Sequence, residues 1–533
     1  MLLKTHSLRQ IDEAYIRGLP REEVDRLSVK LLNDLKEAHE RLNQNPSNSS
    51  VPPSARAPWL SNDEGAGDED EDEDEALEGA ELPHDDDQPA PSEDGAASAE
   101  APQPPPAPST GKAGAEPKRK PGRQHGAPGH GRTQHLAVTK TVHHRARRCA
   151  ACEQAAPEDL TEHRAWTGFY CIDIVLGEPT RPGLTLTNTL HRYYDLRCRC
   201  GHVTREAPYR APRDGLWEDV GLTEWRLVGP MLCALIVALT YRSRMSRARA
   251  REFLRDWLGL SLSVGTLQRC IEESGRAAEP VEEQLVEAVL DSGLLHADET
   301  THKENGQALW LWVFVNVSTT LFYIGHRTRE IVENLLGDGY TGWLMSDGYV
   351  VYRAYLKRLR CWAHLQRKAK GLEDSLEQAA RGFGRETGQL LSTLMAAVYR
   401  AREGPPGEDL TPTFQKLLDA FRATCEQMES CSHDKTRELA CEFLNDWDAI
   451  FAVLAHPHLP LTNNEAERAL RHWVIWRRIS YGTRTPVGSR TMALLASIID
   501  TCRRRGVSPW PYLAEVIAAG RQGRAVPQLP AAA

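Results

Sequence analysis

The stretch Leu294-Leu295-His296-Ala297-Asp298-Glu299-Thr300 decides the fold, because an apolar, strand-like run ends there on acidic residues. A buried carboxylate that stays ionised without a partner costs several kcal/mol. A second run, Trp343-Leu344-Met345-Ser346-Asp347-Gly348, repeats this design. If the two strands are neighbours, Asp298 and Asp347 lie side by side at one edge of a sheet. Paired carboxylates are hard oxygen ligands, so we expect them to bind Mg²⁺ or Mn²⁺.

The segments after Asp298 predict how the surrounding sheet is connected. They read as strands at 309–315 and 320–324, a helix at 330–336, the strand ending at Asp347, a helix at 349–357 and a strand at 359–364. Three strands, helix, strand, helix, strand is the order of a ribonuclease-H-like fold, in which the first strand lies beside the fourth. We therefore expect a multidomain α/β protein with a mixed-sheet, ribonuclease-H-like catalytic core.

A site of this kind normally takes a third acid from a later helix. The stretch 371–457 reads as a helical insertion, and the next helical pattern, 462–471, contains Glu465 and Glu467. Residues two apart on a helix point to different sides, so only one of these acids can face the aspartates. The pattern alone leaves both open.

Composition sets the class of protein and of partner. A chain of 533 residues is too long for one core, and a hydrophobic content of 41% supports globular folding. The net charge of -9 conceals a contrast, because residues 61–100 hold 18 Asp and Glu and no Lys or Arg, which leaves the remainder net positive. A basic remainder suits a polyanionic partner, although a solvated surface is the alternative.

The start of the chain and the cysteines indicate a reduced, cytoplasmic setting. Residues 1–6 lack the sustained apolar region of a signal peptide, and most of the 12 cysteines are scattered. The most apolar run, 227–241, is shorter than the roughly 20 residues that span a bilayer. We expect a buried helix there and no membrane contact.

The pattern along the chain predicts these segments. They are an N-terminal helical region (1–60), a disordered acidic and Pro/Ala-rich linker (61–116), a basic linker with a zinc-binding ribbon (117–212), a helix-turn-helix-like module (213–285), the catalytic domain (286–475) with its insertion at 371–457, and a C-terminal helical region (476–533). The N-terminal helix can pack on the protein or dimerise, and the acidic run can solvate the chain or mimic nucleic acid.

Two features that precede the predicted catalytic domain suggest contact with nucleic acid. Lys118, Arg119, Lys120 and Arg123 lie on a Gly/Pro-rich backbone that can follow phosphates without reading sequence, with a plain basic linker as the alternative. The stretch 246–267 reads as two helices joined by a Gly-containing turn, the second opened at Ser263. This is typical of a helix-turn-helix, and also of helical hairpins that never touch DNA.

The clustered cysteines predict a metal site of a different kind. Cys149 and Cys152 form one knuckle and Cys198 and Cys200 a second, with strand-like sequence between them. Four thiolates on two knuckles are typical of a structural zinc ribbon, with buried free cysteines as the alternative. The second knuckle is one residue tighter than usual, so His202 could replace one thiolate.

With these motifs in order, the chain resembles the transposases of the insertion sequence 66 family. The resemblance rests on 48–50 with 52–54, 128–131, the cysteine knuckles, 262–266, 296–300, 346–349, 361–364, and Asn463-Asn464 with Ala466-Glu467-Arg468. It implies an Asp-Asp-Glu site of Asp298, Asp347 and Glu467, the last because it follows the Asn-Asn-x-Ala pattern. The tight second knuckle, Thr462 and His472 depart from the family pattern.

The resemblance implies a function and partners. The function is that of a bacterial transposase in which two Mg²⁺ ions serve DNA cleavage and strand transfer at one site. The partners would be terminal inverted repeats and target DNA, further copies of the chain in a synaptic complex, and accessory proteins of the same element. The chain itself would be associated with the nucleoid. A nuclease that cuts without joining, and a non-catalytic zinc-ribbon DNA-binding regulator, are the alternatives.

Residues beside the acids have their own predictions. We expect Glu299 to form a surface salt bridge, and Cys361 and His364 to serve packing and hydrogen bonding rather than metal or phosphate contact. Arg468 and Arg471 can contact DNA phosphates or pair with Glu467. The arginines between 477 and 505 form either a DNA-facing surface or a solvated helical face.

Overall fold

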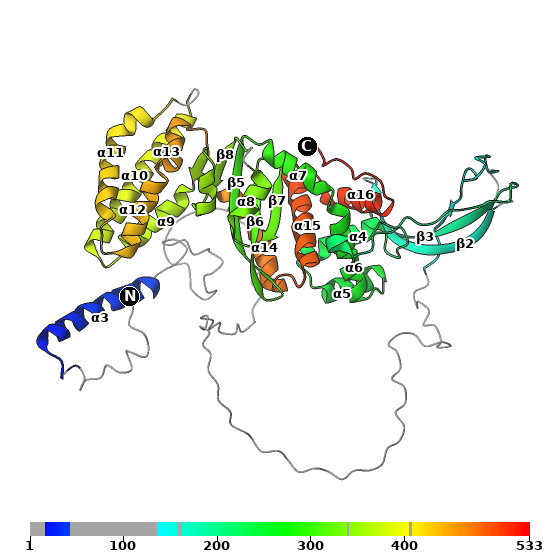
Figure 1. Ribbon diagram of the computed structural model, residues 1–533, viewed down its shortest axis with the longest axis horizontal. Coiled ribbons are helices and arrows are strands. Elements are labelled where there is room, and N and C mark those ends of the chain that lie inside the picture. Colours follow the sequence, from blue (N-terminus) through cyan, green and yellow to red (C-terminus); the bar gives the residue numbers. More distant parts are fainter. Residues whose placement is uncertain are drawn as a thin grey trace, which may run out of the picture. The chain divides into compact units, whose positions relative to one another are not determined.

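The structure is a computed structural model that describes residues 16, 18–42, 136–157, 163–178, 180–337, 340–404 and 408–532 (Figure 1). The predicted acidic linker and the basic segment with Lys118, Arg119, Lys120 and Arg123 lie outside these residues. The N-terminal region contains α3 (Arg21–Leu42), whose first turn carries Glu22 and Glu23. Acidic side chains there complement the positive end of the helix dipole.

The first of two mixed sheets is built around a long β-ribbon. Its strands are β1 (Lys140–His144), β2 (His163–Glu178), β3 (Arg181–Arg197) and β4 (Val203–Arg205). The order is β1-β3-β2, with β4 also on β3; β1 runs parallel to β3, and β2 and β4 run antiparallel to it. In the sequence, the cysteine knuckles flank the β2-β3 pair, a region that the sequence predicts to be strand-like.

The ribbon is joined to the helical part of the chain through its backbone. The N–H of Ile172 in β2 donates to the carbonyl of Leu227 at 2.7 Å, and the N–H of Gly229 donates back to Ile172 at 2.7 Å. Asp173 then accepts the N–H of Leu232 at 2.8 Å, in the first turn of α4 (Pro230–Val237). A Cβ at position 229 would overlap the Asp173 side chain, so only glycine permits this approach.

The apolar run 227–241 is a buried helix, as predicted. Its residues form α4 and a π-helical turn at Ala238–Arg242, and Cys233, Ala234 and Ile236 are fully buried. Among the described residues, no helix is both long and apolar enough to cross a bilayer.

The two predicted helices of the 246–267 stretch are α5 (Arg247–Leu258) and α6 (Val264–Ala278). Ser246 and Ser263 cap them by accepting the N–H groups of Arg249 and Thr266. Gly259 ends α5 at φ 64°, a left-handed conformation that favours glycine. α7 (Val281–Leu290) follows. A DNA contact by these helices stays a prediction.

The second sheet carries the acidic strands. Its elements are β5 (Leu294–Glu304), β6 (Gln307–Val315), β7 (Thr320–Gly325), α8 (Arg329–Leu336), β8 (Trp343–Ser346) and β9 (Arg358–Arg360). The order is β7-β6-β5-β8-β9, with β5, β8 and β9 parallel and β6 antiparallel to both neighbours. The first strand therefore pairs with the fourth, as expected.

Two details of the predicted order are wrong. The helix expected at 349–357 is only a 3₁₀ turn at Val350–Ala354. The strand expected at 359–364 ends at Arg360, because Cys361 is the N-cap of α9 (Trp362–Glu373). Trp362 leaves the sheet to become buried, and its N–H and its indole Nε1 donate to the carbonyls of Leu461 and Ile450 at 2.8 and 2.9 Å.

The stretch predicted as an insertion forms a helical bundle with a core of its own. It contains α10 (Gln378–Arg402), α11 (Thr411–Met428), α12 (Asp434–Asn445) and α13 (Trp447–Ala455), seen together in Figure 1. Phe383, Phe421 and Phe443 pack at its centre, and Trp362 of α9 joins the same cluster. The domain boundaries given above stay predictions.

Three C-terminal helices return to the second sheet and to α4. They are α14 (Asn464–Ser480), α15 (Pro486–Arg504) and α16 (Pro509–Arg521). α14 contacts β5 and β6, and α15 covers the edge strand β7 (Figure 1). The edge N–H groups of Thr320 and Phe322 donate to Thr501 Oγ1 and Ser497 Oγ at 3.0 and 2.8 Å. The helix thus satisfies an edge that would otherwise pair with another chain.

Candidate active site

The carboxylate pair comes from the register of the two parallel strands. The last paired positions of β5 and β8 are His296 and Met345, so Asp298 and Asp347 each follow two residues later. Side chains two residues apart in a strand point to the same face. Asp298 remains within β5, opposite Val313 of β6, whereas Asp347 lies just after β8. Both are half-buried.

The surroundings of Asp298 favour a bound cation. Its Oδ1 accepts the N–H of Glu299 at 2.8 Å. Even so, burial and then the carboxylates of Asp347, Glu299 and Glu467 raise its pKa well above the usual range. Neighbouring carboxylates repel one another when all are ionised, and a divalent cation bound between them offsets this repulsion. The residues present therefore fit such an ion.

Asp347 is held on both sides of its Cα atom. Its Oδ1 accepts the N–H of Tyr349 at 3.1 Å, and its carbonyl accepts from the buried Arg360 guanidinium at 2.9 Å. Gly348 follows at φ 112°. The chain therefore leaves β8 by a turn in which both the backbone and the side chain of Asp347 are fixed.

The two candidate third acids have different partners. Glu467 accepts from His364 Nε2 at 3.0 Å, and this hydrogen bond, against the effect of burial, lowers its pKa. Glu465 pairs instead with Arg468 at 3.0 Å and with Arg504 at 2.8 Å. The charge of Glu467 is among those that raise the pKa of Asp298.

Asn463 fixes the start of α14 against the sheet. Its Nδ2 donates to the carbonyl of Ala297 at 2.9 Å, its Oδ1 lies 3.1 Å from His296 Nδ1, and its N–H donates to Cys361 Sγ at 3.2 Å. His296 and Ala297 directly precede Asp298 in β5, so Asn463 joins the helix of Glu467 to the strand of Asp298. Sequence patterns reveal Asn463 only as a motif residue, because its three contacts are more than 100 residues away in the sequence.

Cys361, His364 and Glu467 form a second group with ligand atoms. Their sulfur, nitrogen and oxygen atoms lie within 4.8 Å of one another. Cys361 is buried and His364 hydrogen-bonds Glu467, which agrees with the packing and hydrogen bonding predicted for both. A thiol, an imidazole and a carboxylate also match a transition-metal site.

The predicted surface salt bridge of Glu299 is buried instead. The Glu299 side chain is 1% exposed, pairs with Arg327 at 2.7 Å and accepts from the Tyr352 hydroxyl at 2.9 Å. Arg327 in turn lies over the rings of Trp310 and Tyr349. Burial and the neighbouring Asp347 raise the pKa of Glu299 to about 7, against the effect of Arg327. The salt bridge is confirmed and its surface location was wrong, because Tyr352 is fully buried against it.

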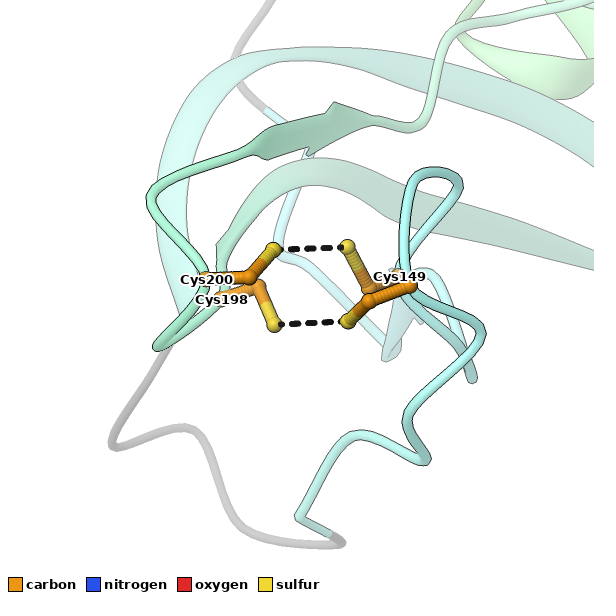
Figure 2. A group of neighbouring side chains, drawn as sticks. Cys149, Cys198 and Cys200 are labelled. Carbon is orange, nitrogen blue, oxygen red and sulfur yellow. Dashed lines mark hydrogen bonds between the residues drawn. The ribbon is translucent and has the colours of Figure 1, made fainter.

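The four clustered cysteines come together at one end of the first sheet. Sulfur atoms of Cys149 and Cys200 are 3.7 Å apart, and those of Cys152 and Cys198 are 3.5 Å apart (Figure 2). All four lie within 4.8 Å, a group that does not include His202. Their loops turn through Glu153 at φ 57° and Gly201 at φ 88°.

The thiols of this cluster do not all ionise easily without a cation. Backbone N–H groups of Cys152 and Ala151 lower the pKa of Cys149 to about 6. The N–H of Cys200 likewise favours ionisation of Cys198, but neighbouring thiols outweigh it and raise that pKa to about 12. Thiolates are the ligand form that zinc takes, and the ion relieves this repulsion, so the cluster fits zinc.

The arginines proposed for DNA contact differ in their surroundings. Arg471 is exposed on α14. Arg490 pairs with Glu282 and Arg504 with Glu465, and each of these arginine side chains is 21% exposed. Arg477 donates to Thr300 and Thr301 of β5, the strand that also carries Asp298, at 3.2 Å each.

Comparison with known proteins gives relatives of unassigned role. Uncharacterized protein y4qI of Sinorhizobium fredii (strain NBRC 101917 / NGR234) is 25% identical over 365 residues, 60% of this chain and 66% of its own length. Uncharacterized proteins y4hP and y4jO of the same strain are 26% and 27% identical over 55% and 37% of this chain. The alignments span 58–66% of the lengths of these relatives.

A family profile identifies what the relatives do not. The profile described as Transposase IS66 family matches residues 226–491. The match contains every strand of the second sheet, the helical bundle and α14, and hence Asp298, Asp347 and Glu467. The chain belongs to the IS66 family of transposases.

Proposed function

We propose that the chain is a DNA transposase of a bacterial insertion sequence that cleaves and joins DNA at Asp298, Asp347 and Glu467. One observation carries the proposal. The parallel register of β5 and β8 brings two aspartates to one sheet edge, where a glutamate of α14 adds its charge. The family match supports the same reaction class.

The proposal includes a ribonuclease-H-like identity for the second sheet. Support comes from its order, in which three antiparallel strands are followed by two parallel strands on the far side of the first. The helical bundle then separates the fifth strand from the helix with the third acid. An acidic pair on the first and fourth strands suits phosphoryl transfer, whose catalysis depends on positioning and charge.

The three acids would bind metal ions, and His364 and Asn463 position the third acid. Asp298 and Asp347 would bind two Mg²⁺ or Mn²⁺ ions between them, and Glu467 would bind one of these ions. When bound, such ions activate a water or a DNA 3′-hydroxyl as nucleophile and stabilise the leaving oxygen. His364 orients the Glu467 carboxylate through its 3.0 Å hydrogen bond, and Asn463 fixes the helix that bears it.

The remaining modules would bring DNA to this site. Cys149, Cys152, Cys198 and Cys200 would hold a structural zinc ion in a zinc-ribbon-like module. The 3.5 and 3.7 Å sulfur separations support this, since a tetrahedron with ~2.3 Å Zn–S bonds has edges of ~3.8 Å. Lys118, Arg119, Lys120, Arg123 and Arg471 would contact DNA phosphates. Pairing two transposon ends would need more than one copy of the chain, and accessory proteins of the same element would join this complex.

The test uses a labelled transposon end and a target duplex with Mg²⁺. Asp298→Ala, Asp347→Ala and Glu467→Gln should each abolish cleavage and joining while DNA binding persists. Glu465→Gln, two residues away on the same helix, is the matched control and should retain both. Cleaved ends without joined product would indicate the nuclease alternative, and normal strand transfer by Glu467→Gln would overturn the assignment.

A further inference from the structure

Arg360 joins the second sheet to the helical bundle through one buried guanidinium. Arg360 is the last residue of β9, and its side chain is 0% exposed. It donates to Asp446 and to Glu442, and its Nη2 also donates to the carbonyl of Asp347 at 2.9 Å. One side chain thus contacts two carboxylates of the bundle, Asp446 and Glu442, and the backbone carbonyl of Asp347 in the candidate active site.

The acids that hold Arg360 both come from the bundle. Glu442 lies in α12, and Asp446 lies between α12 and α13 with its side chain 0% exposed. Arg353 and Arg358 also donate to Asp446, at 3.1 and 3.0 Å. Removing one partner from a buried ion cluster is strongly destabilising, so the bonds made by Nη1 and Nη2 restrict Arg360 to one position.

Gly348 shows how tightly this guanidinium fits against the loop after Asp347. A Cβ at position 348 would overlap the Arg360 guanidinium, and the residue has φ 112°. Any side chain here would therefore strain the backbone and displace Arg360. The contact is built for close approach of the guanidinium to this turn.

We propose that Arg360 is a positioning residue for Asp347, held by Glu442 and Asp446, so that the helical bundle sets the geometry of the active site. The bundle is then part of the catalytic apparatus, not a separate attachment. The inference rests on the proposed function, because it concerns a carboxylate assigned there to metal binding. Second-sphere partners of metal ligands typically change metal affinity or activity ~10–100-fold.

The experiment compares matched variants of the full chain. Arg360→Lys keeps the charge but loses the planar fork that reaches three acceptors. Gly348→Ala displaces the same contact without removing a charge. Arg385→Lys, which changes an exposed pair with Glu373 at 3.6 Å, and Gly388→Ala, with open space around it, are the controls. Near-UV circular dichroism identifies variants that fold.

Two readouts separate this inference from the proposed function. Mn²⁺ affinity, measured by electron paramagnetic resonance, and the Mg²⁺ dependence of cleavage should both weaken ~10–100-fold in Arg360→Lys and Gly348→Ala. DNA binding and both control variants should match the wild type. If Arg360→Lys does not fold, Gly348→Ala decides.

The outcomes distinguish the two claims. Folded Gly348→Ala with wild-type Mn²⁺ affinity and wild-type cleavage would overturn the positioning role. A wild type that binds Mn²⁺ without cleaving DNA would instead overturn the proposed function, and the Mn²⁺ measurements would still decide whether Arg360 positions Asp347.

Discussion

Replacing Asp500 by Asn tests how the helix bearing the third acid is held. Asp500 of α15 accepts the indole Nε1 of Trp473 at 2.8 Å, and Trp473 is a fully buried residue of α14. Burial raises the pKa of Asp500 from 3.8 to about 6, against the opposing effects of this hydrogen bond and of nearby arginines. Asparagine keeps a carbonyl that can accept the indole and has no charge.

The sign and size follow from this pKa. Between pH 3.8 and about 6 the folded chain keeps a proton that the unfolded chain releases, so this group lowers stability as pH rises. A shift of about two pKa units corresponds to about 3 kcal/mol, at ~1.36 kcal/mol per unit. The stability of Asp500→Asn relative to wild type should therefore increase by about 3 kcal/mol between about pH 4 and pH 7.

The assay must report on α14 and α15, because a chain of this size does not unfold in one step. Unfolding in urea is monitored by hydrogen exchange in peptides from these two helices. This measurement gives the local free energy of unfolding of α14 and α15. Asp448→Asn, at an exposed site of α13, is the control. A difference between Asp500→Asn and wild type that stays constant from pH 4 to pH 7 would refute the reasoning.

Two further predictions concern stability elsewhere in the chain. Cys198→Ser should lose bound zinc, measured by elemental analysis, and should unfold residues 136–205 while the second sheet keeps its hydrogen-exchange protection; full zinc retention would contradict the four-cysteine site. Arg521→Met leaves Glu273, 3% exposed, with Arg226 as its remaining ion-pair partner among the described residues, and should cost about 3–5 kcal/mol in urea unfolding. A loss no larger than that of the exposed Arg524→Met would contradict this.

The sequence predicts the second sheet well because β5, β6 and β7 are apolar runs separated by clear turns, and the short β8 is an apolar run that ends before an acid. The acidic strand ends also predict their own proximity, since parallel neighbours bring equivalent positions to one edge. The stretch 361–364 was mistaken for strand because Cys361 and Trp362 are as apolar as a strand. Only the bundle core, contributed by residues up to 99 positions later, draws Trp362 out of the sheet.

The surroundings of the site were less predictable, because they depend on contacts distant in the sequence. Strand alternation correctly predicts that Glu299 and Asp298 point to opposite faces of β5. It does not show that Arg327 and Tyr352 cover the face of Glu299. The two carboxylates that hold Arg360 lie more than 80 residues later. The choice of Glu467 over Glu465 came from resemblance, and the different partners of the two acids now support it with geometry.

The position of α14 late in the chain has a consequence for synthesis. Glu467 follows Asp298 by about 170 residues, so at ~5–20 residues per second the ribosome adds it about 8–34 s later. During that interval the nascent sheet has both aspartates but lacks α14 and the α15 side chains that satisfy β7. A polypeptide interrupted before α14 therefore presents an open strand edge, and the three acids proposed to act on DNA come together only after α14 has been translated.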